Sequence, residues 1–477
     1  MVGDATTSAT VQSLQQSFVQ HQELLATQAK QLEQQQQQIR EQSEQLRTME
    51  NQLLQLVTAQ NGSGNRLSDQ DGQNVPLELT ADQADKSESG GSGETVSQQT
   101  LATIRLEPED PTENLPYTMP GYLDMPGTNL SMKIGGYAKM SIVQSFDPVG
   151  STDRFIVGLI PVTGDEGGVE SQASLSVAQS RLNLDVRGNS PMGPLRAFIE
   201  GDFAGSGDTF RLRHAFGQFR KVLAGKTWST FVDSQAVPED IDFEGLNGRI
   251  NVRQAQLRFF PSIGENLELA VAIEDPDPDV TGGTGLTKVP DVVASIRRTW
   301  LNRWHVRTAL LLRKISARPD DNPSVTGTDT GWGLSASGRL NVPRWGTADN
   351  LLFQLNYGDG IGRYINDLGS VGGQDAVFDP VTGELKTLTA FGAYVSFQHW
   401  WSERMRSTLV LGYTDVDNFD FQPDDAYHQT RRVTANLLFS PIPRVDVGAE
   451  LLWGERTNKD GNTGDALQLQ LAARYIF

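Results

Sequence analysis

The sequence predicts an all-β fold, a 16-stranded antiparallel transmembrane β-barrel, with an N-terminal α-helical coiled coil in front of it. Two periodicities predict this fold. Near the amino end every seventh residue is apolar, whereas beyond Ser131 apolar and polar residues alternate one by one. No window approaches the roughly 18 consecutive apolar residues that a membrane-spanning helix needs. Barrel strands remain compatible with the sequence, because only one of their two faces is apolar.

Composition narrows the possible functions. The 477 residues include 40 basic and 59 acidic side chains, which gives a net charge of −19, and cysteine is absent. A disulfide scaffold and a cysteine-ligated metal site are therefore excluded. An acidic chain repels phosphate, so we expect no nucleic-acid partner. No two of the 5 histidines have metal-ligand spacing, and we expect neither a metal nor another cofactor.

The amino-terminal pattern predicts a coiled coil over residues 11–57. One apolar series runs through seven heptads: Val11, Phe18, Leu25, Leu32, Ile39, Leu46 and Leu53. A second series, three residues on, is apolar at both ends and polar in the middle, which gives the seam polar core layers. Layers of glutamine suit three helices, so we expect a homotrimer. The alternatives are a Gln-rich tract with accidental periodicity and a single solvated helix.

A linker over residues 58–126 and a barrel domain over residues 127–477 complete the predicted organisation. Gly, Ser, Asp, Glu and Pro dominate the linker, and this composition buries too little apolar surface to fold alone. At the amino end, residues 1–10 have no basic start and no apolar core, so they do not indicate a targeting signal. We expect either a protein that stays in the cytoplasm or a mature form whose signal has been removed.

Alternation is clearest at the carboxyl end. One face there is apolar and the other mostly polar, with Leu467, Leu469, Leu471, Ala473, Tyr475 and Phe477 opposite Gln468, Gln470, Ala472, Arg474 and Ile476. Sixteen such segments are predicted, centred near residues 138, 180, 199, 214, 226, 254, 270, 294, 310, 336, 353, 393, 410, 434, 450 and 471. Short and long connections are both present, as in outer-membrane barrels. A soluble sandwich or propeller also alternates, but the charged polar face and the tryptophans near strand ends favour the barrel.

Six stretches carry a resemblance to a known family: NLSMKIGGYAKM (129–140), GPLRAFIEGDF (193–203), RLRHAFGQF (211–219), AGKTWSTFVD (224–233), YGDGIGRYI (357–365) and AARYIF (472–477). In this order they resemble the DcaP-like trimeric outer-membrane porins. The resemblance implies a trimer of barrels in the outer membrane of a Gram-negative bacterium, with the coiled coil as a periplasmic stalk. It also implies passage of small negatively charged solutes such as dicarboxylates. The terminal Tyr475 and Phe477 resemble the signal that the barrel-assembly machinery reads.

The loop over residues 231–248 is the predicted constriction. It follows the fifth strand, and in sixteen-stranded porins the loop at this place folds into the pore. Its acids include Glu239, Asp240 and Asp242. The alternative is a solvated external loop whose acids face water.

Arginines in the strand segments are the second candidate feature of the pore: Arg181, Arg196, Arg211, Arg213, Arg253, Arg258, Arg307 and Arg313. A charge at mid-depth on the lipid face costs roughly 2–4 kcal/mol, so we expect these side chains to face the lumen or a barrel end. Guanidinium groups stay ionised and bind carboxylates in a two-pronged manner. They are predicted to line an anion path. The alternative is that they pair with acids of the wall and only brace it.

These observations predict a passive outer-membrane porin for small hydrophilic solutes, preferentially anions, and no enzymatic activity. The expected partners are the solutes, outer-membrane lipid, the barrel-assembly machinery and, for the stalk, peptidoglycan. Two alternatives stay open: a structural tether acting through the coiled coil, and a porin for neutral or sugar solutes. Deleting residues 1–60 separates the tether from the porin, because only a tether would lose its main role while conductance stays intact.

Overall fold

The computed structural model describes residues 121–162, 171–261, 263–264, 266–300, 304–342 and 348–477. The predicted coiled coil over residues 11–57 lies outside the described residues, as does the predicted linker up to residue 120. Both therefore stay predictions. The account below concerns the carboxy-terminal unit of the chain, which begins at Gly91.

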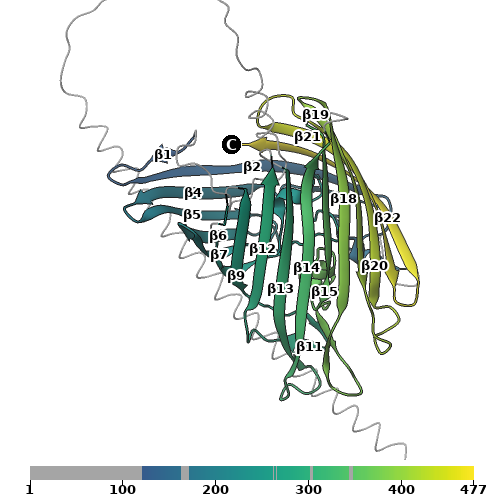
Figure 1. Cartoon of the computed structure of the whole chain (residues 1–477). Helices are drawn as coiled ribbons and strands as arrows, with labels where there is room; N and C mark the ends of the chain where they lie inside the picture. The colour runs from purple at the N-terminus through teal and green to yellow at the C-terminus, as the bar shows by residue number, and fades with distance from the viewer. Residues whose placement is uncertain (1–120, 163–170, 262, 265, 301–303, 343–347) are drawn as a thin grey trace, which may run out of the picture. The chain divides into compact units, whose positions relative to one another are not determined.

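A closed barrel of sixteen antiparallel strands forms the described part of this unit, and it confirms the predicted fold (Figure 1). Each strand pairs with the next along the chain, and pairing of the first with the last, from Tyr137↔Ile476 to Ser145↔Gln468, closes the ring. The strands are β2 (Leu130–Ser145), β4 (Arg181–Ser190), β5 (Gly193–Asp202), β6 (Arg211–Phe219), β7 (Val222–Trp228), β8 (Arg253–Phe259), β9 (Leu267–Glu274), β12 (Asp291–Trp300), β13 (Trp304–Pro319), β14 (Gly327–Asn341), β15 (Asn350–Asp359), β18 (Thr389–Ser402), β19 (Met405–Val416), β20 (Tyr427–Phe439), β21 (Val445–Asn458) and β22 (Thr463–Ile476).

Short strands and helical turns are attached to the barrel. Three strands extend its sheet, namely β1 (Leu123–Asp124), β3 (Gln172–Ser176) and β11 (Gly283–Gly285). A separate small sheet contains β10 (Val280–Thr281), β16 (Ala376–Phe378) and β17 (Leu385–Thr387). The helical turns are η1 (Val157–Leu159), η2 (Ser234–Ala236), η3 (Gly362–Tyr364) and α3 (Leu368–Val371). Among the described residues, no helix has both the length and the apolar character to cross a membrane.

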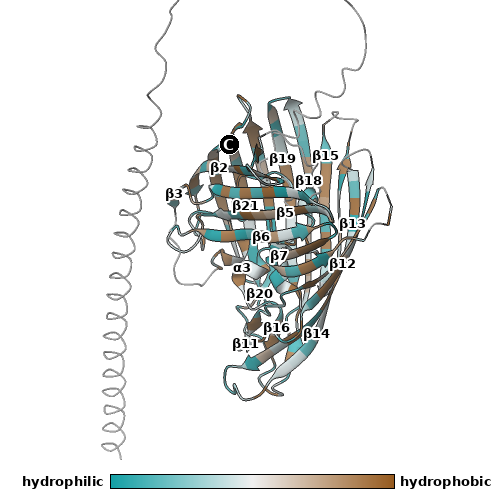
Figure 2. Ribbon diagram, turned by 90° about the vertical axis from the view of Figure 1, so that its left-hand side faces the viewer, coloured by the Kyte–Doolittle hydropathy of each residue, from teal (hydrophilic) through white to brown (hydrophobic). Residues whose placement is uncertain are grey.

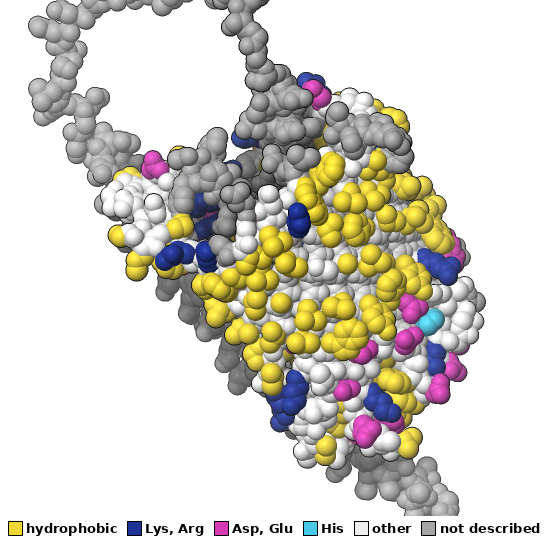
Figure 3. Space-filling model, viewed as in Figure 1, with side chains coloured by type: hydrophobic (Ala, Val, Ile, Leu, Met, Phe, Trp, Pro, Cys, Tyr) yellow, Lys and Arg dark blue, Asp and Glu magenta, His cyan; other side chains and the backbone are white. Residues whose placement is uncertain are grey.

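Burial is inverted relative to a soluble protein. On β22 the side chains of Gln468 and Gln470 are 0% exposed, whereas Leu471 is 40% exposed and Tyr475 is 52% exposed. The same alternation runs around the barrel, so apolar side chains cover the outside and polar ones fill the inside (Figures 2 and 3). An apolar exterior with a polar interior is the arrangement that lipid around a water-filled lumen requires.

Replacing Leu411 by arginine tests this assignment of the outer face. Leu411 is 49% exposed at the middle of β19, so a charge there would face lipid at mid-depth. We expect the free energy of unfolding to fall by about 2–4 kcal/mol, measured by urea titration in lipid vesicles. Met405 lies on the same face at the strand end, and Met405→Arg should cost at most about 1 kcal/mol. Equal costs at the two positions would contradict the assignment.

The connection between β7 and β8, residues 229–252, lies inside the barrel and is called here the inward loop. Its residues reach side chains on many strands of the far wall. The Ile241 amide donates to Glu450 on β21 at 2.6 Å, and Asp233 accepts from His305 on β13 at 2.9 Å. The predicted constriction segment, 231–248, is therefore surrounded by barrel wall.

Glycines allow the inward loop to lie directly on this wall. Gly248 has a φ of +74°, and a Cβ there would lie 2.5 Å from the Tyr413 carbonyl oxygen. On the wall itself, a Cβ at Gly412 would lie 2.1 Å from Asn247 Oδ1, and one at Gly392 would lie 2.8 Å from the Gly248 carbonyl oxygen. At Gly248 the backbone of the loop thus touches the backbone of β18 and β19, while the Asn247 side chain lies over Gly412.

A second loop, residues 146–162 after β2, also turns inward. Phe155, Val157 and Ile160 are buried against Leu452 and Ala466 on the wall. The Phe155 amide donates a hydrogen bond of 3.0 Å to Asp242 of the inward loop. The two loops are thus joined to each other as well as to the barrel.

Candidate functional site

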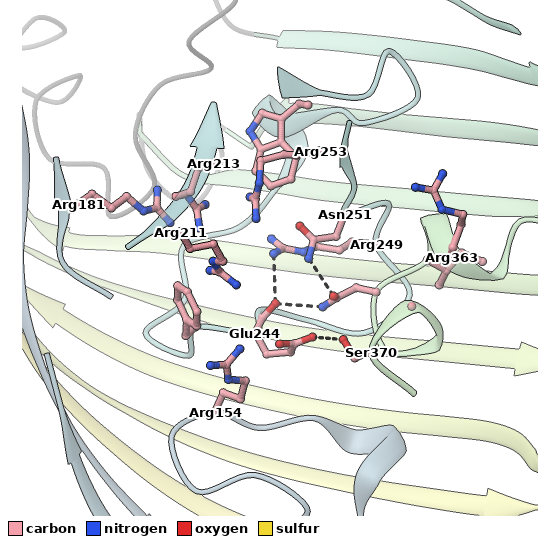
Figure 4. Close-up of a pocket in the computed structure, with 15 residues that line it drawn as sticks. Arg154, Arg181, Arg211, Arg213, Glu244, Arg249, Asn251, Arg253, Arg363 and Ser370 are labelled. Atoms are coloured by element: carbon pink, nitrogen blue, oxygen red, sulfur yellow. Dashed lines mark hydrogen bonds between the residues drawn. The ribbon is translucent and has the colours of Figure 1, made fainter. Parts of the chain in front are cut away.

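A pocket of about 270 Å³ lies between the β4–β8 side of the wall, the inward loop and the η3–α3 turn (Figure 4). Its lining residues come from the barrel wall and from connections that lie inside the barrel. The pocket is lined by Arg154, Arg181, Arg211, Arg213, Trp228, Phe243, Glu244, Arg249, Asn251, Arg253, Arg363, Ile365, Asn366, Gly369 and Ser370.

Charge is the distinguishing property of this pocket. Seven of its lining residues are arginines, and Glu244 is the acidic residue among them. Figure 4 shows how these side chains surround the pocket, with Arg249 beside Glu244 at its centre. Arg181, Arg211, Arg213 and Arg253 come from β4, β6 and β8, whereas Arg154, Arg249 and Arg363 come from loops. So many positive charges close together repel one another, and nearby acids are needed to stabilise them.

Acidic side chains behind the pocket form ion pairs with three of the seven arginines. Asp202 binds Arg211 and Arg213, each at 2.8 Å. Glu200 lies 3.8 Å from Arg181 and 3.4 Å from Arg213. Both acids belong to the neighbouring strand, β5, so register alone brings them opposite the arginines.

The two loop arginines at the pocket's edges also have acidic partners. Arg154 binds Asp153 at 2.9 Å. Burial opposes the charge on Arg154, but the hydrogen bond and the charge of Asp153 outweigh it and raise the pKa of Arg154. Arg363 lies 3.8 Å from the exposed Asp277. These acids hold both guanidinium groups at the pocket wall.

Arg249 and Arg253 differ from the other five arginines. Within the described residues, no acidic side chain lies within ion-pair distance of either one. Arg249 donates from Nη2 to the Glu244 carbonyl oxygen at 3.2 Å, and its buried Nε has no hydrogen-bond partner among the described residues. The Arg253 guanidinium lies over the Trp228 ring, 4.3 Å from its centre. The charges of these two arginines are therefore not cancelled by an ion pair among the described residues.

Aromatic rings support the arginines without neutralising them. Trp228 lies under Arg253, and Phe243 lies between Arg154 at 4.9 Å and Arg211 at 5.3 Å. The negative face of a ring attracts a cation while leaving its hydrogen-bond donors free. The guanidinium groups are thereby oriented but remain able to bind a carboxylate.

Of the eight arginines that the sequence singled out, four line the pocket: Arg181, Arg211, Arg213 and Arg253. The other four lie elsewhere in the barrel and make structural contacts. Arg196 binds Asp185 at 2.7 Å, and Arg258 donates to Gln256 at 2.9 Å. Arg307 donates to the main-chain oxygens of Thr230 and Phe231, and Arg313 binds Asp291 and Asp375.

The three acids predicted on the constriction loop are buried and do not line the pocket. Glu239 binds Arg406 on β19, and Asp242 binds Arg432 on β20 at 2.9 Å. Asp240 is 8% exposed between them. The acids of this loop therefore hold it to the far wall, and only Glu244 lies at the arginine pocket.

Three arginines of the pocket were not predicted from the sequence: Arg154, Arg249 and Arg363. All three lie in connections between barrel strands, where alternation does not indicate which way a side chain points. For Arg249 a usable signal was its place directly after Gly248, at the end of a loop already expected to enter the pore. Nothing in the sequence around Arg154 distinguishes it from an external residue.

The closed barrel, its apolar exterior and the arginine pocket in its interior define a channel protein of the outer membrane. The family model of the DcaP outer membrane protein matches residues 119–477. The chain belongs to this family, which places its barrel in the outer membrane of a Gram-negative bacterium.

Solved structures share the fold. The outer membrane channel DcaP of Acinetobacter baumannii superimposes with a TM-score of 0.66 at 21% identity, over 75% of this chain and 100% of that one. The anion-selective porin from Comamonas acidovorans has a TM-score of 0.49 at 10% identity, over 73% and 100% of the two chains. OmpT of Vibrio cholerae has a TM-score of 0.46 at 10% identity, over 74% and 99%. No curated protein matches the chain.

Proposed function

We propose that this protein is a passive diffusion channel that favours small hydrophilic anions, dicarboxylates among them. The observation that supports the proposal is the pocket in the barrel interior, where seven arginines meet one acid. Five of the arginines have acidic partners, so Arg249 and Arg253 supply the charge that a solute meets. Two guanidinium groups in one pocket, neither paired with an acid among the described residues, match a solute with two carboxylates.

Passive diffusion is the mechanism that such a pocket supports. An anion in the lumen exchanges water for the donors of Arg249 and Arg253, and it moves on down its concentration gradient. A channel site must bind strongly enough to attract the solute and weakly enough to release it. The partial neutralisation by Asp202 and Glu200 serves this balance, because it reduces the field of the pocket. Anions are favoured since cations are repelled by the same field.

The reversal potential of the purified protein in a planar bilayer tests the proposal. In a potassium chloride gradient we expect the sign that marks chloride as the more permeant ion. Addition of succinate, a dicarboxylate, should lower the chloride current by occupying the pocket, whereas the same concentration of glycerol should not. A preference for potassium would contradict anion selectivity, although the barrel would still be a channel.

The proposal extends to assembly. We propose that three barrels associate and that residues 11–57 form a periplasmic coiled-coil stalk, joined to the barrels through residues 58–126. The heptad pattern and the polar core layers support this part of the proposal. Chemical crosslinking of a peptide covering residues 11–57 tests it, and a dimer would contradict it.

A further inference from the structure

Glu244 is the acidic side chain among the residues that line the arginine pocket. The neighbouring acids of the inward loop are engaged elsewhere, since Asp242 binds Arg432 and Glu239 binds Arg406. Their charges are neutralised by the far wall of the barrel. The Glu244 carboxylate forms no ion pair with the wall, so such a pair does not explain its place in the pocket.

Contacts hold Glu244 at the pocket without pairing its carboxylate to an arginine. Its carbonyl oxygen accepts from Arg249 Nη2 at 3.2 Å and from Asn366 Nδ2 at 3.0 Å. Its carboxylate accepts a hydrogen bond from the Ser370 hydroxyl on α3 (Figure 4). Among the described residues, no arginine lies within ion-pair distance of this carboxylate. Ser370 thus holds the negative charge in the pocket and away from the cations.

We propose that Glu244 is a selectivity-determining residue: a tethered carboxylate that weakens the binding of multivalent anions in the arginine pocket and so keeps their release fast. The inference rests on the proposed anion channel. Without Glu244 the field of the arginines would act on the solute undiminished, and a multivalent anion would remain bound. With it, the field is lower by one charge, yet the donors of Arg249 and Arg253 stay open to the solute.

The state of the carboxylate also depends on pH. Burial raises the pKa of Glu244 and the charge of Asp242 acts in the same direction, while the Ser370 hydrogen bond and the charges of Arg154 and Arg249 oppose them. The other charged groups that line the pocket are Arg181 on β4, Arg211 and Arg213 on β6, Arg253 on β8 and Arg363 on η3. A group with a raised pKa is protonated first as the solution becomes acidic. The pocket therefore gains positive charge as pH falls.

Block of the potassium chloride current by sulfate tests the inference, because sulfate keeps two negative charges throughout the mildly acidic and neutral range. For Glu244→Gln we expect the half-blocking sulfate concentration to fall about tenfold, as expected for one charge removed from a partly screened site. For Ser370→Ala we expect the opposite shift, because the released carboxylate can approach the arginines and compete with sulfate. In the unmodified protein, sulfate block should strengthen as the pH falls, because protonation of Glu244 removes its negative charge. That pH dependence should be absent in Glu244→Gln.

Asp424→Asn is the matched control, since it removes the same charge from an exposed loop residue outside the pocket. Its sulfate block should equal that of the unmodified protein. If the unmodified channel prefers potassium, the proposed function is wrong, whatever the effect of Glu244→Gln. An anion-selective channel in which Glu244→Gln leaves sulfate block unchanged, or in which Asp424→Asn shifts it equally, would overturn the role of Glu244 alone.

Discussion

Replacing Arg253 by alanine will reduce the ratio of chloride to potassium permeability by about tenfold, which corresponds to about 1.4 kcal/mol. The reason is that no acid among the described residues is close enough to form an ion pair with this guanidinium, so its positive charge adds to the field of the pocket. Two unit charges about 6 Å apart interact by roughly 3 kcal/mol at an effective dielectric constant of about 20, which leaves room for screening by salt. The reversal potential in a salt gradient measures the change.

Two further variants make this prediction specific. Arg253→Lys keeps the charge and should keep most of the selectivity, although it loses the planar contact with Trp228. Arg431→Ala removes one positive charge from a side chain that is 56% exposed and does not line the pocket. It should leave the permeability ratio unchanged. If Arg253→Ala and Arg431→Ala gave the same ratio, the pocket would not be the selectivity site.

The second large effect is expected at Asp242, which joins both inward loops to the wall. Its carboxylate accepts from Arg432 at 2.9 Å, from Gln470 at 2.9 Å and from the Phe155 amide at 3.0 Å. Asp242→Ala leaves Arg432 buried without its partner, which costs about 3–5 kcal/mol. We expect the loops to detach locally and the single-channel conductance to rise, because the lumen widens.

A double variant separates the charge from the loop contacts. Replacing Arg432 by methionine in the Asp242→Ala background removes the unpaired cation, so the protein should regain much of its stability against urea. The conductance should stay high in the double variant, because the loops still lack their anchor. An Asp242→Ala channel with unchanged conductance and unchanged stability would show that the loops are held by other contacts.

The strands could be predicted from sequence because lipid and water act on alternate residues of each strand. Gln468 and Leu471 on β22 obey this rule directly, since one is buried and the other faces outward. The same physics predicted that Arg181 and Arg196 avoid the lipid face, and both are largely buried in the structure. Alternation says which way a side chain points, but it does not say what the side chain meets there.

Long-range contacts explain what the sequence could not reveal. The partners of Asp242 are separated from it by 87, 190 and 228 residues, and no local pattern indicates that they meet. Arg307 and Arg313 point inward as predicted. There they hold loop segments that a sequence pattern cannot place. The pocket depends on how three connections fold back into the barrel. Its arginines on the strands could therefore be predicted from alternation, whereas those in the connections could not.

The glycines behind the inward loop have a consequence for the width of the passage. Because Gly392 and Gly412 carry no side chain, the loop rests directly on the wall. A methyl group at either position would displace the loop toward the barrel axis, and Glu244 and Arg249 would move with it because both belong to this loop. The bore of the channel and the geometry of its pocket are therefore linked, so a substitution on the wall behind the loop changes both without altering any charge.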